Sequence, residues 1–497
     1  MIAAVLGDMA GISLFKGVQA HPLLRSFRDV LESAAGEALC PQSGRGPCGR
    51  GADGPSRRTS GERVRPIRSW AAFTARLART GQDYSWYNAI ARLTLFDDNP
   101  FTRAAESQEN PPAFLRALAK TDLSRLGRIA AFAPHKLGLH LAEGLRNAGL
   151  STAAQSIEEE AWAVHAAAKG AQGEALGPLG IFPANSDWGT ALPAMAAHIH
   201  AHGAALLGQY RAFCWIPRHI RRPSSLPAAE SADEGLDRFL KPIENPDPIR
   251  LAQLCGYQEQ RSIVIANTLR FVEGGRGNNL LLYGDRGTGK SASVKAAANA
   301  YACRGLKLLE LNKADLPELP HILKLLRSRS RRFILFIDDL SFERVDDAFR
   351  SLKALLEGCV EVQPGNTVIY ATSNRRHLVK EPLADRPTAA MAAQAAATGD
   401  LRSFDTMQEQ FSLADRFGLT VIYTAPDRDD YVRIAEHIAR DRGLLEAAGE
   451  EELGRFRADA LRWEQWFNGR SARTAVQYVD WIAGAQGNPQ ALRFPWE

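Results

Sequence analysis

The sequence predicts an α/β protein whose C-terminal half forms a three-layer parallel sheet, with helical regions before and after it. Three observations support this fold class. From about residue 237, short apolar runs alternate with helical patterns, and strands separated by helices build parallel sheets. A glycine-rich loop, GDRGTGKS at residues 284–291, follows the first of these runs. The spacing of apolar residues before residue 220 and after residue 426 is that of amphipathic helices.

Five apolar runs are predicted to be the strands of the parallel sheet. They are Leu280–Tyr283, Lys307–Leu311, Phe333–Ile337, Thr367–Thr372 and Leu419–Tyr423. Helical patterns lie between most of them, so each strand is expected to be followed by a crossover that covers one face of the sheet.

A chain of 497 residues is too long for one hydrophobic core, and we expect several segments. The stretch 41–66 is rich in Gly, Pro, Ser and Arg, which predicts a disordered linker, and a helix is expected around Pro22–Glu37. The expected organisation is an N-terminal extension at 1–66, a helical domain at 67–220, a linker at 221–236, a nucleotide-binding core at 237–425 and a helical lid at 426–497.

The composition is that of a soluble globular protein, with 45% hydrophobic and 24% charged residues. No apolar run is long enough for a membrane span, and the six scattered cysteines suit a reducing compartment, so we expect a cytoplasmic protein without a membrane partner. The net charge of +5 is concentrated in residues 41–68. Nucleic acid is therefore an alternative partner, but no base-reading motif is present, and the basic run 327–332 is interpreted as a solvated turn.

The loop at 284–291 fits the G-x-x-x-x-G-K-[S/T] phosphate-binding pattern between a strand and a helix. Backbone N–H groups at the helix N-terminus would hold the phosphates, Lys290 would reach the β- and γ-phosphates, and Ser291 would hold Mg²⁺. The loop residues expected to bind the nucleotide are Gly284, Asp285, Arg286, Gly287, Thr288, Gly289, Lys290 and Ser291. The loop predicts binding of a nucleoside triphosphate such as ATP.

Two later strands end in polar residues. FILFIDDL places Asp338 and Asp339 after a buried strand, where Asp338 would coordinate Mg²⁺ through oxygen. Asp339, or alternatively Glu343, would polarise the attacking water, and Asn374 at the end of VIYATSN would orient that water. By themselves, two acids after a strand are also typical of a helix N-cap.

Arginines near the C-terminus can reach a phosphate from elsewhere in the fold. Arg416 precedes the last strand, and Arg470 and Arg473 begin an amphipathic helix. A guanidinium at the γ-phosphate neutralises charge in the transition state, although each arginine alone is also compatible with a surface position.

This order of elements, from phosphate loop to acidic strand, polar strand end, DRFG box and helical lid, resembles the AAA+ ATPases. More closely, PDPIRLAQLCGYQEQ, NNLLLYGDRGTGKS, FIDDLSFE and SLADRFGLTV resemble an uncharacterised bacterial AAA+ family catalogued as domain of unknown function 815. The resemblance covers about residues 205–485 and includes YRAFCW at 210–215. The acid pair and the DRFG box are also similar to those of replication initiators and helicase loaders.

The resemblance implies roles for particular residues. Asn374 corresponds to the sensor-1 polar residue and Arg416 to the inter-subunit arginine finger. Arg473 best corresponds to the sensor-2 arginine of the lid, with Arg470 as the alternative. The remaining implied residues are Gly256 and Tyr257, which fall where such proteins enclose the adenine.

The sequence therefore predicts an ATPase that uses Mg²⁺ and ATP to drive or gate a conformational change in an unidentified macromolecular partner, as a homo-oligomer. Two other functions remain open: a nucleotide-dependent binding module with little turnover, and a small-molecule phosphotransferase. The histidines of HIHAH, His198, His200 and His202, are expected at surface or interhelical positions and not at a metal site, because only His198 and His202 share a helix face and no flanking carboxylate or thiol completes a site.

Overall fold

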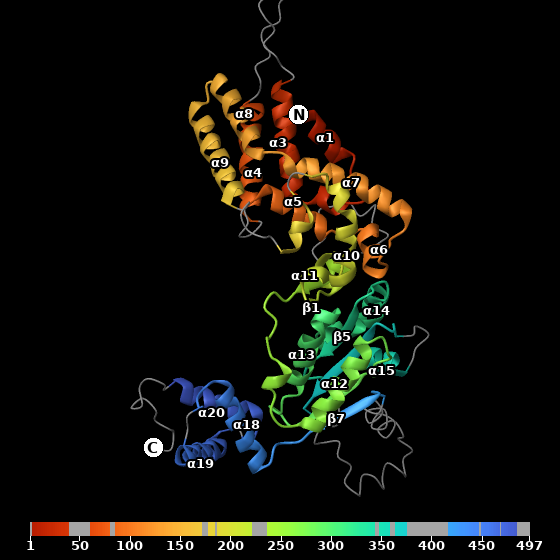
Figure 1. Cartoon of the computed structure of the whole chain (residues 1–497), viewed down its shortest axis with the longest axis vertical. Coiled ribbons are helices and arrows are strands. Elements are labelled where there is room, and N and C mark those ends of the chain that lie inside the picture. Colours follow the sequence, from red (N-terminus) through yellow and green to blue (C-terminus); the bar gives the residue numbers. More distant parts are fainter. Residues whose placement is uncertain are drawn as a thin grey trace, which may run out of the picture. The chain divides into compact units, whose positions relative to one another are not determined.

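The computed structural model describes residues 2–38, 60–79, 85–170, 177–183, 186–220, 236–342, 347–357, 363–374, 416–446, 449–467 and 469–484. The chain divides into two compact units, Met1–Gln209 and Tyr210–Glu497, drawn in Figure 1. The boundary lies at residue 209, not at the expected 220, because residues 210–220 contain a strand of the second unit.

The first unit is helical, as the spacing of its apolar residues predicts. Its helices are α1 (Ile2–Ala10), α2 (Lys16–Ala20), α3 (Pro22–Ala38), α4 (Ser60–Ala78), α5 (Trp86–Leu95), α6 (Pro100–Ser107), α7 (Ala113–Ala131), α8 (Pro134–Asn147), α9 (Ser151–Gly170), α10 (Leu192–His202) and α11 (Ala205–Gln209).

The described residues before 67, at 2–38 and 60–66, belong to this helical unit and are not a separate extension. Helix α3, predicted from its sequence, buries Leu24 and Phe27 in the same core as Trp70 and Phe73 of α4. The helical spacing of these apolar residues explains the packing, since it places them on one face. Helix α4 begins at Ser60, which corrects the linker expected over 41–66 at its C-terminal end, while residues 39–59 lie outside the described ranges.

The second unit contains a seven-stranded sheet in the order β2-β1-β4-β5-β6-β3-β7. The five predicted strands are confirmed. They are β3 (Leu280–Gly284), β4 (Leu306–Leu311), β5 (Arg332–Ile337), β6 (Thr367–Ser373) and β7 (Leu419–Tyr423). These strands are parallel, and β3 lies between β6 and β7, neither of which is adjacent to it in sequence. Such a switch in strand order is where α/β sheets bind ligands, beyond the carboxyl ends of the strands.

Two further strands extend the sheet beyond β4. Strand β1 (Ala212–Trp215) pairs parallel to β4, and β2 (Leu240–Pro242) pairs antiparallel to β1. Residues 221–235, which lie outside the described ranges, therefore connect two neighbouring strands of one sheet. This pairing corrects the expectation that 221–236 is a linker between domains.

Helices cover both faces of the sheet. Helices α12 (Gln258–Val272) and α13 (Lys290–Tyr301) share one core with alternate residues of the strands, including Leu282, Leu308 and Phe336. The intervening side chains, such as Leu309 and Leu335, are equally buried. Helices α14 (Leu319–Arg327) and α15 (Asp347–Glu357) are the crossovers of β4-β5 and β5-β6, and they form the other layer.

Three helices after β7 form the predicted C-terminal lid, drawn in blue in Figure 1: α18 (Arg428–Asp441), α19 (Glu450–Trp466) and α20 (Ala472–Gly484). They have their own apolar core around Tyr431, Phe456 and Tyr478. Tyr257 packs against both this core and the core of the sheet, so it connects the three C-terminal helices to the sheet.

Within the described ranges, none of the helices has the length and apolar character that crossing a membrane requires.

Candidate functional site

A pocket of about 790 Å³ lies at the carboxyl ends of β3, β5 and β6, against the lid. Its walls come from segments far apart in the chain: the phosphate loop, the acidic strand end, the segment before α12, and the lid. The predicted residues that line it are Tyr257, Arg286, Gly287, Thr288, Gly289, Lys290, Ser291, Asp338, Asp339, Asn374 and Arg473. This volume is in the range of pockets that hold ligands of nucleotide size.

The phosphate loop has the backbone that its glycines predict. Gly287 and Gly289 have φ angles of +74° and +90°, which residues with a Cβ rarely adopt. A Cβ on Gly287 would also lie 2.8 Å from Oγ of Ser471 in the lid. Helix α13 begins at Lys290, within the loop motif, so its free N–H groups face the pocket and can donate hydrogen bonds to an anion.

The ammonium of Lys290 lies over the loop. It donates hydrogen bonds to the carbonyl oxygens of Gly284 (2.9 Å) and Asp285 (2.6 Å). Burial lowers the pKa of Lys290, and the carboxylates of Asp285, Asp339 and Asp338 partly oppose this effect. A phosphate in the pocket would supply the negative charge that the buried ammonium requires.

The acidic strand end forms a small network of oxygen atoms. Ser291 Oγ donates to Asp338 Oδ1 over 2.6 Å, and Thr372 Oγ1 donates to the same oxygen over 2.6 Å. A hydroxyl and a carboxylate oxygen at hydrogen-bonding distance are the hard ligands that Mg²⁺ prefers. The residues present therefore fit a magnesium ion at Ser291 and Asp338.

Asp339 has a φ angle of +51°, an uncommon conformation for a residue other than glycine. Its N–H donates to Thr372 Oγ1 (2.9 Å), and its Oδ1 accepts from Asn374 Nδ2 (2.6 Å). The structure thus brings Asp339 and Asn374 together at the pocket. Glu343, the alternative to Asp339, lies outside the described residues.

A further part of the pocket lining comes from the segment before α12 and from the lid, and it includes several apolar residues. Tyr257 and Gly256 both have positive φ angles, +53° and +72°, and together they turn the chain into α12. Tyr257 lines the pocket, whereas Gly256 approaches Ile434 of the lid from outside the pocket lining. The other apolar lining residues in this part are Ile249, Leu254, Cys255, Ile434, Ile438 and Val476.

The two lid arginines have different surroundings. Arg473 lines the pocket, and its backbone N–H donates to the carbonyl of Gly287 over 3.2 Å. Arg470 lies 3.2 Å from Glu464, with which it forms an ion pair, and lines a separate surface pocket with Ala425 and Asp427. The structure therefore brings Arg473, and not Arg470, to the phosphate loop.

Arg416 does not line the pocket of its own chain. Its Nη2 lies 2.9 Å from Oε1 of Glu357 in α15, and both side chains are partly exposed. Asp415, its neighbour in the DRFG box, lies outside the described residues.

Gly284 and Asp285 support the loop and do not line the pocket. A Cβ on Gly284 would lie 1.8 Å from the carbonyl oxygen of Tyr423, so the close contact between β3 and β7 requires glycine. Asp285 Oδ2 accepts a hydrogen bond from the N–H of Ala425. Its side chain therefore points to the connection between β7 and the lid.

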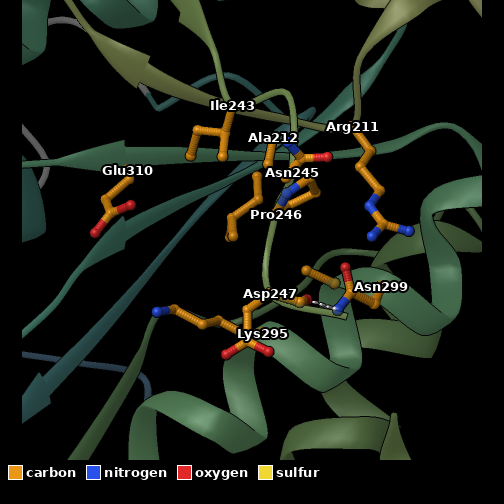
Figure 2. Close-up of a pocket in the computed structure, with 11 residues that line it drawn as sticks. Arg211, Ala212, Ile243, Asn245, Pro246, Asp247, Lys295, Asn299 and Glu310 are labelled. Carbon is orange, nitrogen blue, oxygen red and sulfur yellow. Dashed lines mark hydrogen bonds between the residues drawn. The ribbon is translucent and has the colours of Figure 1, made fainter. Parts of the chain in front are cut away.

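A smaller pocket of about 130 Å³ lies beside the first, under the segment that follows β2 (Figure 2). Asn299 of α13 donates to the carbonyls of Asp247 and Ile249, which holds this segment on the helix. Asp247 of this segment and Lys295 of α13 line both pockets.

Two weaker predictions have plain structural outcomes. The rings of His198 and His202 stack with their centroids 4.3 Å apart, and no group of three or more His, Cys, Asp or Glu side chains suited to a metal occurs in the described part of the chain. The basic run is a turn that is only partly solvated, because Arg327 is exposed whereas Arg329 and Arg331 are buried and Arg332 lies over the ring of Phe271.

Several residues of the pocket were not predicted from the sequence. Thr372 holds both acids, and Arg261, Lys295, Asp247 and Gln253 complete the lining. Thr372 has a detectable signal, since it is a small polar residue near the end of a buried strand beside the acidic one. The other four have none, because they come from surface positions of helices and connections.

A family model described as "Protein of unknown function (DUF815)" matches residues 226–486, more than half of the chain. The matched region contains the phosphate loop, both acids, Asn374 and the lid. No curated protein matches the chain.

Solved structures similar to the chain include two of Thermotoga maritima RuvB. One is a variant with 16% identity and a TM-score of 0.27, and the other, described as a Holliday junction branch migration motor, has 15% identity and a TM-score of 0.25. Each match covers 47% of this chain and 72% of the RuvB chain. Scores of this size assign no function.

Proposed function

We propose that this chain, which belongs to the family described as protein of unknown function (DUF815), is an AAA+ ATPase that hydrolyses ATP with Mg²⁺ to change the conformation of a macromolecular partner. One observation carries the proposal. Lys290, Ser291, Asp338 and Arg473, from three separate segments, line the same pocket at the carboxyl ends of the strands. This combination supports a triphosphate site and not only a glycine-rich turn.

Binding of the triphosphate is assigned to the loop and to the start of α13. Backbone N–H groups of the loop would donate to the phosphate oxygens, and Lys290 would move from the carbonyls of Gly284 and Asp285 to the phosphates. Charge-assisted bonds to an anion are stronger than bonds to a neutral carbonyl, so this exchange is favourable. The base would lie near Tyr257 and Ile434.

Mg²⁺ would be held by Ser291 and Asp338 and would neutralise charge on the phosphates. Thr372 keeps the Asp338 carboxylate in place through its hydrogen bond. Asp339 would accept a proton from the attacking water, and Asn374 would orient it, with Glu343 as the alternative to Asp339. Whichever acid has this role must lie within hydrogen-bond distance of the attacking water, because only then can it accept the proton.

The lid and a neighbouring subunit would couple ATP hydrolysis to a change in the position of the lid. Arg473 would contact the phosphates from the lid, so that the angle of the lid depends on the nucleotide. Arg416 is assigned to the site of a neighbouring subunit, which makes the active form a homo-oligomer. The cysteines that the structure describes, Cys214, Cys255 and Cys303, are free, which supports a reducing compartment such as the cytoplasm.

The direct test is ATP turnover by the purified full chain. Replacing Lys290 with Ala should reduce phosphate release by about 100-fold or more, because it removes a cation that stabilises the transferred phosphoryl group. Lys324→Ala, which removes an exposed lysine of α14 far from the pocket lining, is the matched control and should keep the wild-type rate. Equal turnover in the Lys290 variant and the wild type would disprove the proposal.

The same assay separates the alternative functions. An ATPase releases phosphate from ATP and water alone, whereas a phosphotransferase requires an acceptor. A binding module would bind ATP tightly with almost no release of phosphate, and the presence of Asp339 where a longer glutamate could act keeps this alternative open.

A further inference from the structure

The first variable residue of the phosphate loop contacts the connection to the lid. Asp285 Oδ2 accepts a hydrogen bond from Ala425 N over 2.6 Å, and Asp285 N donates to the carbonyl of Tyr423 over 2.9 Å. Tyr423 is the last residue of β7, and α18 begins at Arg428. Residues 423–427 therefore form the hinge between core and lid, and one loop residue binds two of its backbone groups.

A second side chain binds the hinge from the segment before α12. The hydroxyl of Tyr257 donates to the carbonyl of Thr424 over 2.7 Å, and its ring lies 5.1 Å from that of Tyr423. The hinge residues Tyr423, Thr424 and Ala425 are thus each held by a hydrogen bond to a residue at the edge of the pocket. A hinge held in this way does not move independently of the loop.

The backbone carbonyls of Gly284 and Asp285 bind Lys290. Its ammonium donates to the carbonyls of Gly284 and Asp285, so the backbone at 284–285 lies between the lysine and the hinge. A phosphate competes with these carbonyls for the ammonium, because an anion is the stronger acceptor. Release of the two carbonyls removes a restraint on the loop at the point where it binds the hinge.

We propose that Asp285 is a positioning residue that transmits the state of the phosphate loop to the lid. Its carboxylate acts as a hydrogen-bond acceptor for Ala425 and does not bind the nucleotide. This inference rests on the proposed function, since it requires a triphosphate at Lys290. Arg473 would link the lid to the phosphates directly. The contact of Asp285 with the backbone of Ala425 would be a second link between the phosphate loop and the lid, on the side of the sheet.

The chemistry of the contact separates this role from a purely electrostatic one. An asparagine at position 285 keeps an acceptor oxygen for Ala425 but loses the charge. An alanine loses both. If Asp285 acts through its hydrogen bond to the hinge, Asp285→Asn should therefore behave like the wild type. If it acts through its charge on Lys290, the two variants should be equally defective.

The experiment uses the full chain with Asp285→Ala, Asp285→Asn and, as a matched removal of an exposed carboxylate, Glu273→Ala. Glu273 forms an exposed ion pair with Arg304 at the end of α12. Hydrogen exchange of the peptide containing Ala425 is measured with and without ATP, beside equilibrium ATP binding, kcat and KM. Exchange of this amide reports the opening of the hinge directly.

We expect ATP to change the exchange of the Ala425 peptide in the wild type, in Asp285→Asn and in Glu273→Ala. In Asp285→Ala, exchange without nucleotide should be about tenfold faster, because the acceptor oxygen for the Ala425 N–H is lost. The ATP-dependent change should disappear and kcat should fall about tenfold, while KM and the affinity for ATP stay within about threefold of the wild type.

Two results would overturn the inference. An Asp285→Ala protein that binds ATP and keeps the normal ATP-dependent change at Ala425 would show that the hinge does not depend on this carboxylate. Equal defects in Asp285→Asn and Asp285→Ala would assign the effect to charge. Failure of the wild type to bind ATP would instead refute the proposed function, and the coupling with it.

Discussion

The hydroxyl of Thr372 organises the acidic end of the pocket. It donates to Asp338 Oδ1 and accepts from the N–H of Asp339, which uses both the donor and an acceptor site of one hydroxyl. This contact helps hold Asp339 at its positive φ angle, a conformation that persists only where the surroundings support it. The two neighbouring acids therefore point in different directions, one toward Ser291 and the other toward Asn374.

The two lid arginines give a prediction at the same scale. Arg473→Ala should weaken ATP binding and turnover about tenfold, because it removes a cation from the pocket lining. Arg470→Ala removes an arginine only three positions away and serves as the matched control. It should leave turnover unchanged and cost less than about 1 kcal/mol of stability, as expected for a partly exposed ion pair.

Isothermal calorimetry with ATP, together with the rate of phosphate release, checks this pair of variants. A larger loss of ATP affinity in Arg470→Ala than in Arg473→Ala would contradict the assignment of Arg473 to the phosphates.

The sequence predicts residues of the pocket well where a pattern fixes them. Lys290 and Ser291 occupy invariant positions of the loop pattern, and Asp338 and Asn374 follow buried strands whose ends meet at one edge. The role of Asp285 could not be predicted, because the pattern leaves its position variable and its contact is with a residue 140 positions away. Arg470 and Arg473 could not be distinguished, since the direction of each side chain depends on how the lid packs.

At the scale of elements, the five long strands are evident because each is a mainly apolar run, and β3, β4, β5 and β6 are buried on both faces. Strand β7 lies at the edge of the sheet and has one exposed face, with Ile422 48% exposed. Strands β1 and β2 are not evident, since they have only four and three residues, and one of them ends in proline. They form because β4 would otherwise be an edge strand with unpaired backbone groups. Residues 210–220 were therefore assigned to the helical domain, although Phe213 and Trp215 are buried in the second unit.

The position of β1 in the sheet predicts how N-terminal truncation affects the stability of the second unit. A chain of residues 210–497 keeps β1 beside β4 and should remain a compact, monodisperse unit. A chain of residues 236–497 loses the buried Phe213 and Trp215 and exposes the edge of β4, which should cost about 5 kcal/mol or more and favour aggregation.

Light scattering after size-exclusion chromatography and thermal unfolding compare the two truncated chains. Phe213→Ala in the full chain keeps the length and should also lower the unfolding temperature. Equal stability of both truncated chains would show that β1 is dispensable for the sheet.

For the whole molecule, the position of Arg416 predicts an activity that depends on assembly. Arg416 is paired with Glu357 and is absent from the lining of its own pocket, so a catalytic role requires a neighbouring subunit. Arg416→Ala and Asp338→Ala should each abolish most turnover. Mixed in equal amounts, they should recover roughly a quarter of the wild-type rate, because about one site in four combines an intact Asp338 with an Arg416 from its neighbour in a head-to-tail ring.

The recovery is measured as phosphate release across a range of mixing ratios, with each variant mixed with itself as the control. Absence of recovery at every ratio, in variants that still assemble, would argue against an arginine supplied between subunits.

The connection between β1 and β2 has a consequence for variation in the length of the chain. The length of a linker between two domains limits how far the domains can separate, so a change in that length would alter how they work together. Residues 221–235 instead join two paired strands at one edge of a sheet. Lengthening a loop with fixed ends costs only closure entropy, about 0.6 kcal/mol for each doubling. Insertions at this position should therefore cost little stability, and we expect the chain to accept an added sequence there without a change in the proposed nucleotide site.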